Sequence, residues 1–159
     1  MKYGFLVLAS AIASAATSQN AAPPNVVIIL ADDLGYGDIS CQNLNSKIKT
    51  QWIDQLSSEG IRFTDAHSAS GVSSPSRYSL LTGRYHWRGN LKAGIINQWG
   101  DPAIEDGRMT IALMLKGKGY QTACIGKWHL GQTWPFRPGL GQNDSSKISW
   151  SNISMNGKE

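Results

Sequence analysis

The run Val26-Val-Ile-Ile-Leu-Ala31, followed at once by Asp32-Asp33, decides the fold that this sequence predicts. An unbroken apolar run of this length suits a strand buried on both faces, and such strands belong to parallel sheets that helices cover. The abrupt change from apolar residues to two carboxylates marks the end of the strand. We therefore expect Asp32 and Asp33 at the carboxyl edge of a sheet.

Further along the chain, helix patterns alternate with strand patterns. Thr50 and Gly60 bracket the first helix as its expected cap and stop, and Gly117 and Gly119 follow the second. The expected elements are the helix Gln51–Glu59, the strand Ile61–Ala66, the helix Thr110–Lys116 and the strand Tyr120–Ile125. Helices that alternate with strands predict an α/β domain with a mostly parallel sheet and right-handed crossovers.

A third helix pattern begins in the stretch Gly71-Val-Ser-Ser-Pro-Ser-Arg77. Ser74 suits the capping position, Pro75 the first helical position, and Gly83 the stop. This assignment places Ser73 just outside the helix N-terminus, where free N–H groups favour an anion or a developing negative charge. Arg77, one turn into the helix, can point back toward Ser73.

Three polar groups each follow an expected strand: Asp32-Asp33, Ser73 with Arg77, and Lys127 with His129. Ligand sites in open α/β sheets form beyond the carboxyl ends of strands, so these groups should converge on one face. Two acids, a hydroxyl and potential cations suit a hard metal ion and a tetrahedral anion. Taken singly, each group also fits a plainer interpretation: a turn, a capped helix, a solvated lysine or a packed histidine.

The ends of the chain and its composition bear on localisation and partners. Residues 1–15 have the charged start, apolar run and small-residue site of an export signal, and 16–24 read as a flexible spacer. We expect an exported, periplasmic or extracellular protein without stable membrane insertion, because the apolar run is too short for a span.

The net charge of +4 comes from scattered basic residues, which does not suggest nucleic acid as a partner. The spacing of Cys41 and Cys124 assigns no disulfide, and we expect Cys124 to be buried in its strand.

Three motifs together resemble the formylglycine-dependent, arylsulfatase-like sulfatases of the serine type. They are the segment from Asn25 to Asp38, the segment Ser73-Ser-Pro-Ser-Arg77 with Leu81-Thr-Gly83, and the segment from Gly119 to His129. They stand in the family's order, and the likeness spans roughly Asn25 to Gly131. The resemblance implies the alkaline phosphatase-like α/β fold.

The resemblance also implies a role for each matching residue. Asp32 and Asp33 would be calcium ligands, with the residue at position 73 completing the metal contact. Ser73 would be oxidised to formylglycine, Arg77 would steady that residue, and Lys127 and His129 would engage the sulfate. The reaction implied is hydrolysis of a sulfuric ester, in which one hydroxyl of the hydrated aldehyde attacks sulfur and the other later expels sulfate. A serine-type maturase would act on Ser73 before export, and we expect a sulfated carbohydrate as substrate.

The sequence departs from the family pattern in two places. Thr50-Gln51-Trp52 stands where the family commonly has Thr-Pro-Asn, and the later metal and sulfate ligands of the family have no counterpart before Glu159. We therefore expect 25–159 to be the N-terminal part of a catalytic domain, with 132–159 poorly defined, and a truncated chain to be a weak enzyme. Two alternatives stay open: a phosphatase or phosphodiesterase of the same fold, and a non-catalytic remnant.

Overall fold

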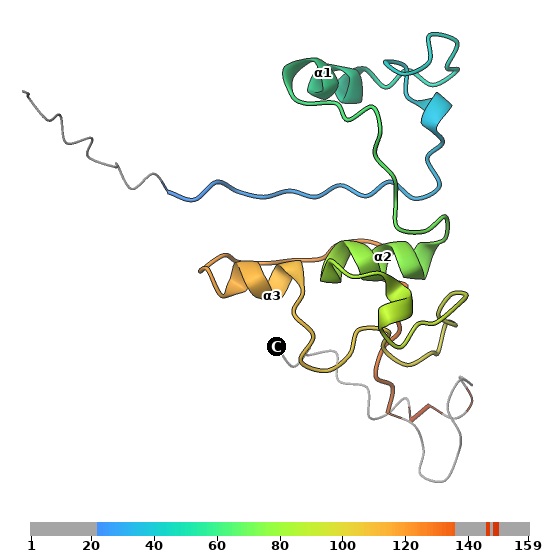
Figure 1. Cartoon of the computed structure of the whole chain (residues 1–159), viewed down its shortest axis with the longest axis vertical. Coiled ribbons are helices and arrows are strands. Elements are labelled where there is room, and N and C mark those ends of the chain that lie inside the picture. The colour runs from blue at the N-terminus through green and yellow to red at the C-terminus, as the bar shows by residue number, and fades with distance from the viewer. Residues whose placement is uncertain (1–21, 136–145, 147, 150–159) are drawn as a thin grey trace, which may run out of the picture. The chain divides into compact units, whose positions relative to one another are not determined.

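The computed structural model describes residues 22–135, 146, 148 and 149 (Figure 1). The expected export signal at 1–15 lies outside the described residues, as does most of 136–159. The chain divides into two compact units, Met1–Ala31 and Asp32–Glu159. All candidate site residues belong to the second unit.

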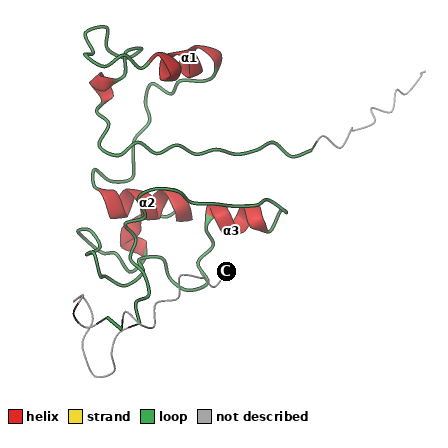
Figure 2. Cartoon of the chain, turned by 180° about the vertical axis from the view of Figure 1, so that it is seen from behind, coloured by secondary structure: helices red, strands yellow, loops and turns green. Residues whose placement is uncertain are grey.

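The described residues contain no strand, so the predicted sheet is not confirmed (Figure 2). Val26–Ala31, in the first unit, is extended but unpaired, and Val27 and Ile29 are 80% and 87% exposed. In the second unit, Ile61–Ala66 and Tyr120–Ile125 are also irregular. A strand is stable only when a neighbour accepts and donates its main-chain hydrogen bonds, and none of these three segments has such a neighbour among the described residues.

The regular elements described are helical. Three are α-helices and two are single 3-10 turns: η1 (Tyr36–Asp38), α1 (Gln51–Glu59), α2 (Ser73–Thr82), η2 (His86–Arg88) and α3 (Ile111–Lys116). The predicted bounds of α1 are confirmed. The helix predicted over Thr110–Lys116 begins one residue later, at Ile111, because Thr110 is its cap and accepts the N–H of Leu113 at 3.2 Å.

Thr50 precedes α1 as predicted, but its side chain does not cap the helix. The hydroxyl instead donates to Asp54 at 3.0 Å and bonds the Ser40 hydroxyl at 2.8 Å. Asp54 also accepts from Ser40 Oγ at 2.6 Å and from the Cys41 N–H at 3.0 Å. These hydrogen bonds, that from Ser40 first, lower the pKa of Asp54 below its ordinary 3.8 and fasten α1 to the loop before it.

The predicted start of α2 is wrong by two residues. The helix begins at Ser73, Val72 is the extended residue before it, and Ser74 and Pro75 lie within the first turn. Ser74 does not cap the helix because its side chain is fully buried and bonds elsewhere in the fold. Pro75 is tolerated because N–H groups in the first turn lack partners within the helix. The stop is confirmed, since Gly83 takes the left-handed conformation with φ of 66°.

A small core holds α2, which contacts η2 and α3 (Figure 1). Tyr78 is fully buried in this core with Leu91, Ala103 and Leu130. Its hydroxyl donates to both carboxylate oxygens of Glu105, at 3.2 and 2.9 Å. Burial, and after it the hydrogen bond to Glu105 and the charge of that carboxylate, raises the pKa of Tyr78 above its ordinary 10.0.

Glu105 joins the tyrosine to two arginines. Arg108 Nε donates to it at 3.2 Å, and Arg84 Nη1 lies 3.6 Å from it. Desolvation raises the pKa of Glu105, but its backbone hydrogen bond and those from Tyr78 and Arg108 together lower it below 4.5. The ionised carboxylate therefore stabilises the fold above pH 4.5, and that contribution is lost as the pH falls through the lowered pKa.

Two further expectations concern the cysteines and the membrane. Cys124 is exposed, so its predicted burial is wrong; the strand that was to bury it does not form. Cys41 is partly buried, and both thiols are free. Among the residues described, no helix has the length and apolar character needed to cross a bilayer.

Candidate active site

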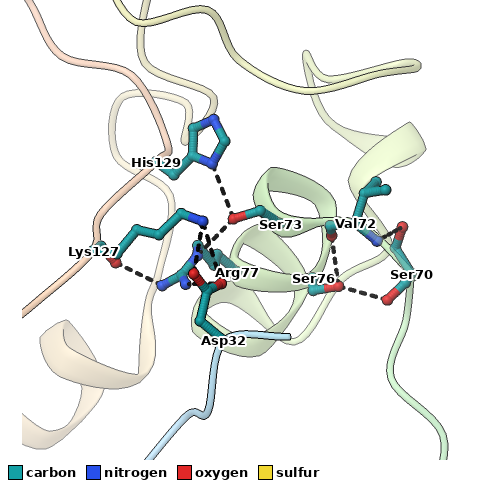
Figure 3. Close-up of polar contacts among 8 residues, drawn as sticks. All are labelled: Asp32, Ser70, Val72, Ser73, Ser76, Arg77, Lys127 and His129. Carbon is teal, nitrogen blue, oxygen red and sulfur yellow. Dashed lines mark hydrogen bonds and ion pairs between the residues drawn. The ribbon is translucent and has the colours of Figure 1, made fainter. Parts of the chain in front are cut away.

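Ser73 opens α2, and Arg77 follows one helical turn later on the same face (Figure 3). Residues four apart on a helix are neighbours, so the guanidinium folds back and its Nε donates to Ser73 Oγ at 2.9 Å. The Arg77 side chain is only 12% exposed. The hydroxyl is thus held beside a fixed positive charge at a helix N-terminus.

Asp32 enters this site from far along the chain (Figure 3). Arg77 Nη2 donates to its carboxylate at 3.1 Å, and Lys127 Nζ donates to both oxygens, at 3.2 and 2.9 Å. The hydrogen bond from Lys127, and behind it that from Arg77, lowers the pKa of Asp32 below its ordinary 3.8 against a smaller desolvation effect. Asp32 is therefore an anionic anchor for both cations.

Lys127 and His129 lie on one loop, and main-chain hydrogen bonds fix the part of that loop that follows His129. Arg77 Nη1 donates to the Lys127 carbonyl at 2.6 Å. Beyond His129, the Leu130 carbonyl accepts the Ala103 N–H at 2.8 Å, and the Gln132 N–H donates to Gly100 at 3.2 Å. Gly131, at φ of 77°, lies so close to the Asp101 carbonyl that a Cβ there would collide with main chain. Only glycine fits at this position.

His129 completes the group from the side opposite Arg77 (Figure 3). Its Nδ1 lies 3.0 Å from Ser73 Oγ, and its Nε2 lies 3.1 Å from the Ile96 carbonyl oxygen. Its backbone has φ of 52°, in the left-handed region that non-glycine residues seldom adopt. Strained conformations of this kind concentrate at functional sites, where surrounding contacts sustain them.

The structure thus brings together five of the six candidate residues: Asp32, Ser73, Arg77, Lys127 and His129. Asp33 is exposed, has φ of 60°, and makes no hydrogen bond or ion pair with the other five. Two cations, one carboxylate and a helix N-terminus surround the Ser73 hydroxyl, an environment that suits attack on an anionic ester.

Three of the candidate residues could bind a metal ion. Asp32, Asp33 and Ser73 offer only oxygen, the donor that a hard cation such as calcium prefers. Among residues 22–135, 146, 148 and 149, no group of three or more acidic, histidine or cysteine side chains is placed to hold a metal. The oxygen donors of these residues are therefore of the type that binds calcium. They would supply part of the roughly six to eight oxygen ligands that calcium usually takes.

A cavity of about 310 Å³ adjoins His129. Three indoles and several side-chain amides dominate its wall, which consists of Asn97, Gln98, Trp99, Trp128, His129, Gly131, Gln132 and Trp134. Trp99 and Trp134 pack edge to face with ring centres 5.1 Å apart, and Trp128 Nε1 donates to the Gly131 carbonyl at 2.8 Å. Among the described residues that line this wall, none is Asp, Glu, Lys or Arg.

Sequence patterns did not indicate two contributors to the site. The Ile96 carbonyl bonds His129, and the buried Ser74 hydroxyl bonds the Ile96 N–H at 3.1 Å. Every residue type has a main-chain carbonyl, so the sequence cannot indicate which carbonyl will contact the site. Ser74 carried a signal, its place beside Ser73, but that place also fits a helix cap.

Comparison with known proteins identifies the family of this chain. The sulfatase family model matches residues 24–156. An N-acetylgalactosamine-6-O-sulfatase of Bacteroides thetaiotaomicron is 46% identical over 113 residues, which cover 71% of this chain and 22% of that protein. Mouse arylsulfatase G is 44% identical over 117 residues, covering 72% and 22% of the two chains, and mouse steryl-sulfatase is 43% identical over 114 residues, covering 69% and 18%. The chain spans about a fifth of the length of these relatives, and it belongs to the sulfatase family.

Proposed function

We propose that this chain carries the nucleophile side of a sulfuric ester hydrolase, with Ser73 as the residue that is converted to formylglycine. The observation that supports this most strongly is the double contact on Ser73 Oγ. Arg77 Nε lies at 2.9 Å and His129 Nδ1 at 3.0 Å, and these groups come from segments separated by about fifty residues. A serine that merely starts a helix needs neither contact.

The side chains around Ser73 divide the work of the reaction. His129 Nδ1 can accept a proton from the hydroxyl at position 73 and so favours its attack on sulfur. Arg77 and Lys127 offset negative charge on the sulfuryl oxygens, and the N–H groups of α2 add to that field. Asp32 keeps both cations in place through the contacts at 3.1 and 2.9 Å.

We also propose that the site contains formylglycine, formed from Ser73, and binds a calcium ion. Ser73 fits formylglycine formation because it is partly buried, lies at a helix start and heads the segment Ser73-Ser-Pro-Ser-Arg77. Formylglycine, once hydrated, would supply two hydroxyls, one to attack sulfur and the other to release the bound sulfate. Asp32 and Asp33 would hold calcium, with the residue at 73 beside it. An ion held by these residues would offset negative charge on the substrate.

For the substrate we propose a sulfated carbohydrate, supported by the cavity beside His129. Indole faces pack against the apolar face of a pyranose ring, and the side-chain amides of Asn97, Gln98 and Gln132 can bond its hydroxyls. One relative carries N-acetylgalactosamine in its name. The described wall residues are tryptophans, amides, glycine and His129, a set that suits a neutral sugar ring as the leaving group.

Cavity binding can be measured without turnover. Saturation-transfer NMR of this chain with an unsulfated methyl glycoside of N-acetylgalactosamine should show contact through the ring protons. Gln132→Ala should weaken that contact several-fold, because Gln132 is exposed and its amide is free to meet sugar hydroxyls. Trp87→Phe is the control, since Trp87 stacks on Tyr85 outside the cavity. Equal loss in both variants, or no transfer to the sugar, would contradict the carbohydrate proposal.

The sulfatase proposal is tested at Ser73 itself. Co-expression with a serine-type maturase in an exporting bacterium should leave the Ser73 peptide lighter by the mass of two hydrogens. The complete gene product so treated should release sulfate from a sulfated hexosamine, lose that activity on calcium chelation and lack it as Ser73→Ala. Intact serine beside a working control substrate would refute the proposal, as would faster hydrolysis of the matching phosphate ester.

A further inference from the structure

Ser74 stands beside Ser73 in the first turn of α2, and its side chain is fully buried. A buried hydroxyl costs stability unless it is hydrogen-bonded. Its Oγ accepts the main-chain N–H of Ile96 at 3.1 Å, across a sequence separation of 22 residues. The helix therefore holds the segment around Ile96 through this side chain.

Ile96 is fixed by contacts at both of its main-chain polar groups. Its N–H donates to Ser74, and its carbonyl faces His129 Nε2 at 3.1 Å. Its side chain packs against the core of Tyr78, Leu91, Ala103 and Leu130. Ile96 thus connects a buried residue of α2 with the imidazole that faces Ser73.

The chemistry of these partners determines where the proton of a neutral His129 lies. A carbonyl oxygen only accepts, so Nε2 must carry the hydrogen, and Nδ1 is then an acceptor. Arg77 Nε already donates to Ser73 Oγ at 2.9 Å, so the hydroxyl proton of Ser73 is directed at Nδ1, 3.0 Å away. The Ile96 carbonyl thereby selects the tautomer that can receive this proton.

We propose that Ser74 is a positioning residue that holds Ile96 in place and, through the Ile96 carbonyl, keeps His129 in the Nε2–H tautomer. Its value for turnover rests on the proposed sulfatase function. The tautomer is a separate property of the folded chain and can be read without any reaction.

The test is ¹⁵N NMR of the histidine rings in the full chain, which has three histidines. His67→Gln and His86→Gln assign the His129 signals by elimination. In the unsubstituted chain, Nε2 should give a protonated signal and Nδ1 an unprotonated one. Ser74→Ala should shift both toward a mixture of tautomers and speed hydrogen exchange of the Ile96 amide about five- to tenfold, the loss of one hydrogen bond. Ser74→Thr keeps the hydroxyl and should restore the signature.

Ser76→Ala is the matched control, because Ser76 Oγ lies on the same turn but bonds the carbonyls of Ser70 and Val72. A like shift in Ser76→Ala would overturn the proposal, as would an unchanged tautomer in a folded Ser74→Ala. If Ser74→Ala does not fold, an Nδ1–H tautomer in the unsubstituted chain still overturns it. The expected tautomer in a complete gene product without sulfatase activity would refute the function and leave the role of Ser74 supported.

Discussion

Arg77→Lys should lower kcat/KM for sulfate ester hydrolysis by about 10²–10³, the usual effect of removing one preorganised donor. The three nitrogens of Arg77 bond Ser73 Oγ at 2.9 Å, the Lys127 carbonyl at 2.6 Å and Asp32 at 3.1 Å. A lysine has one compact ammonium group and cannot reproduce a planar fork with three partners. The substitution keeps the positive charge and removes the planar guanidinium. The expected fall in kcat/KM therefore measures the contribution of the hydrogen-bond geometry of Arg77.

The measurement is sulfate release by the complete gene product, scaled to the fraction of Ser73 converted in each preparation. That scaling separates a catalytic loss from poor maturation. Arg62→Lys is the control, because Arg62 is an exposed arginine that donates to the Cys41 carbonyl at 2.8 Å. If Arg77→Lys retains activity within a factor of a few, the contacts of its guanidinium do not matter for the reaction.

The helices were predictable because their ends carry chemical signals. Gly60 and Gly83 stop α1 and α2, and Gly117 follows the last residue of α3. The start of α2 was not predictable by the same rules, because the Ser74 side chain turns inward to Ile96. The preference of serine for a capping position reflects local interactions only. Here the hydrogen bond between Ser74 and the distant Ile96 outweighs that preference.

The strands were predicted from apolar runs that the structure leaves exposed. Ile125 is 95% exposed and Val27 80%, although both belong to runs typical of buried strands. A sequence run records that a segment suits burial, but it does not supply the neighbour that would bury it.

The candidate site was predicted from the carboxyl ends of strands, and the described residues do not form those strands. Asp32, Ser73 and Lys127 nevertheless lie together, because the contacts on Arg77 and Asp32 connect their segments. The Ile96 carbonyl was not predictable, because any residue type at position 96 would present the same oxygen. Asp33 remains a predicted calcium ligand on sequence and family grounds alone.

Tyr78→Ala should have the largest effect on stability, lowering the free energy of unfolding by about 3–5 kcal/mol. Tyr78 is fully buried in the small core, and its hydroxyl shares its one proton between the two carboxylate oxygens of Glu105. Truncation leaves a cavity and also leaves a partly buried carboxylate with fewer donors. Because α2 carries Ser73 and Arg77, the loss should loosen the site as well as the core.

Thermal unfolding followed by circular dichroism measures the effect, with an expected fall in Tm of roughly 6–20 °C. Tyr78→Phe keeps the ring and removes only the hydroxyl, so it should cost about 1–2 kcal/mol and thus separate packing from hydrogen bonding. Leu80→Ala is the matched control on the same helix, because Leu80 is 42% exposed and its truncation should cost less than about 1 kcal/mol. Equal destabilisation by Tyr78→Ala and Leu80→Ala would show that Tyr78 does not anchor α2, and the core that positions Ser73 would then have to be sought elsewhere in the chain.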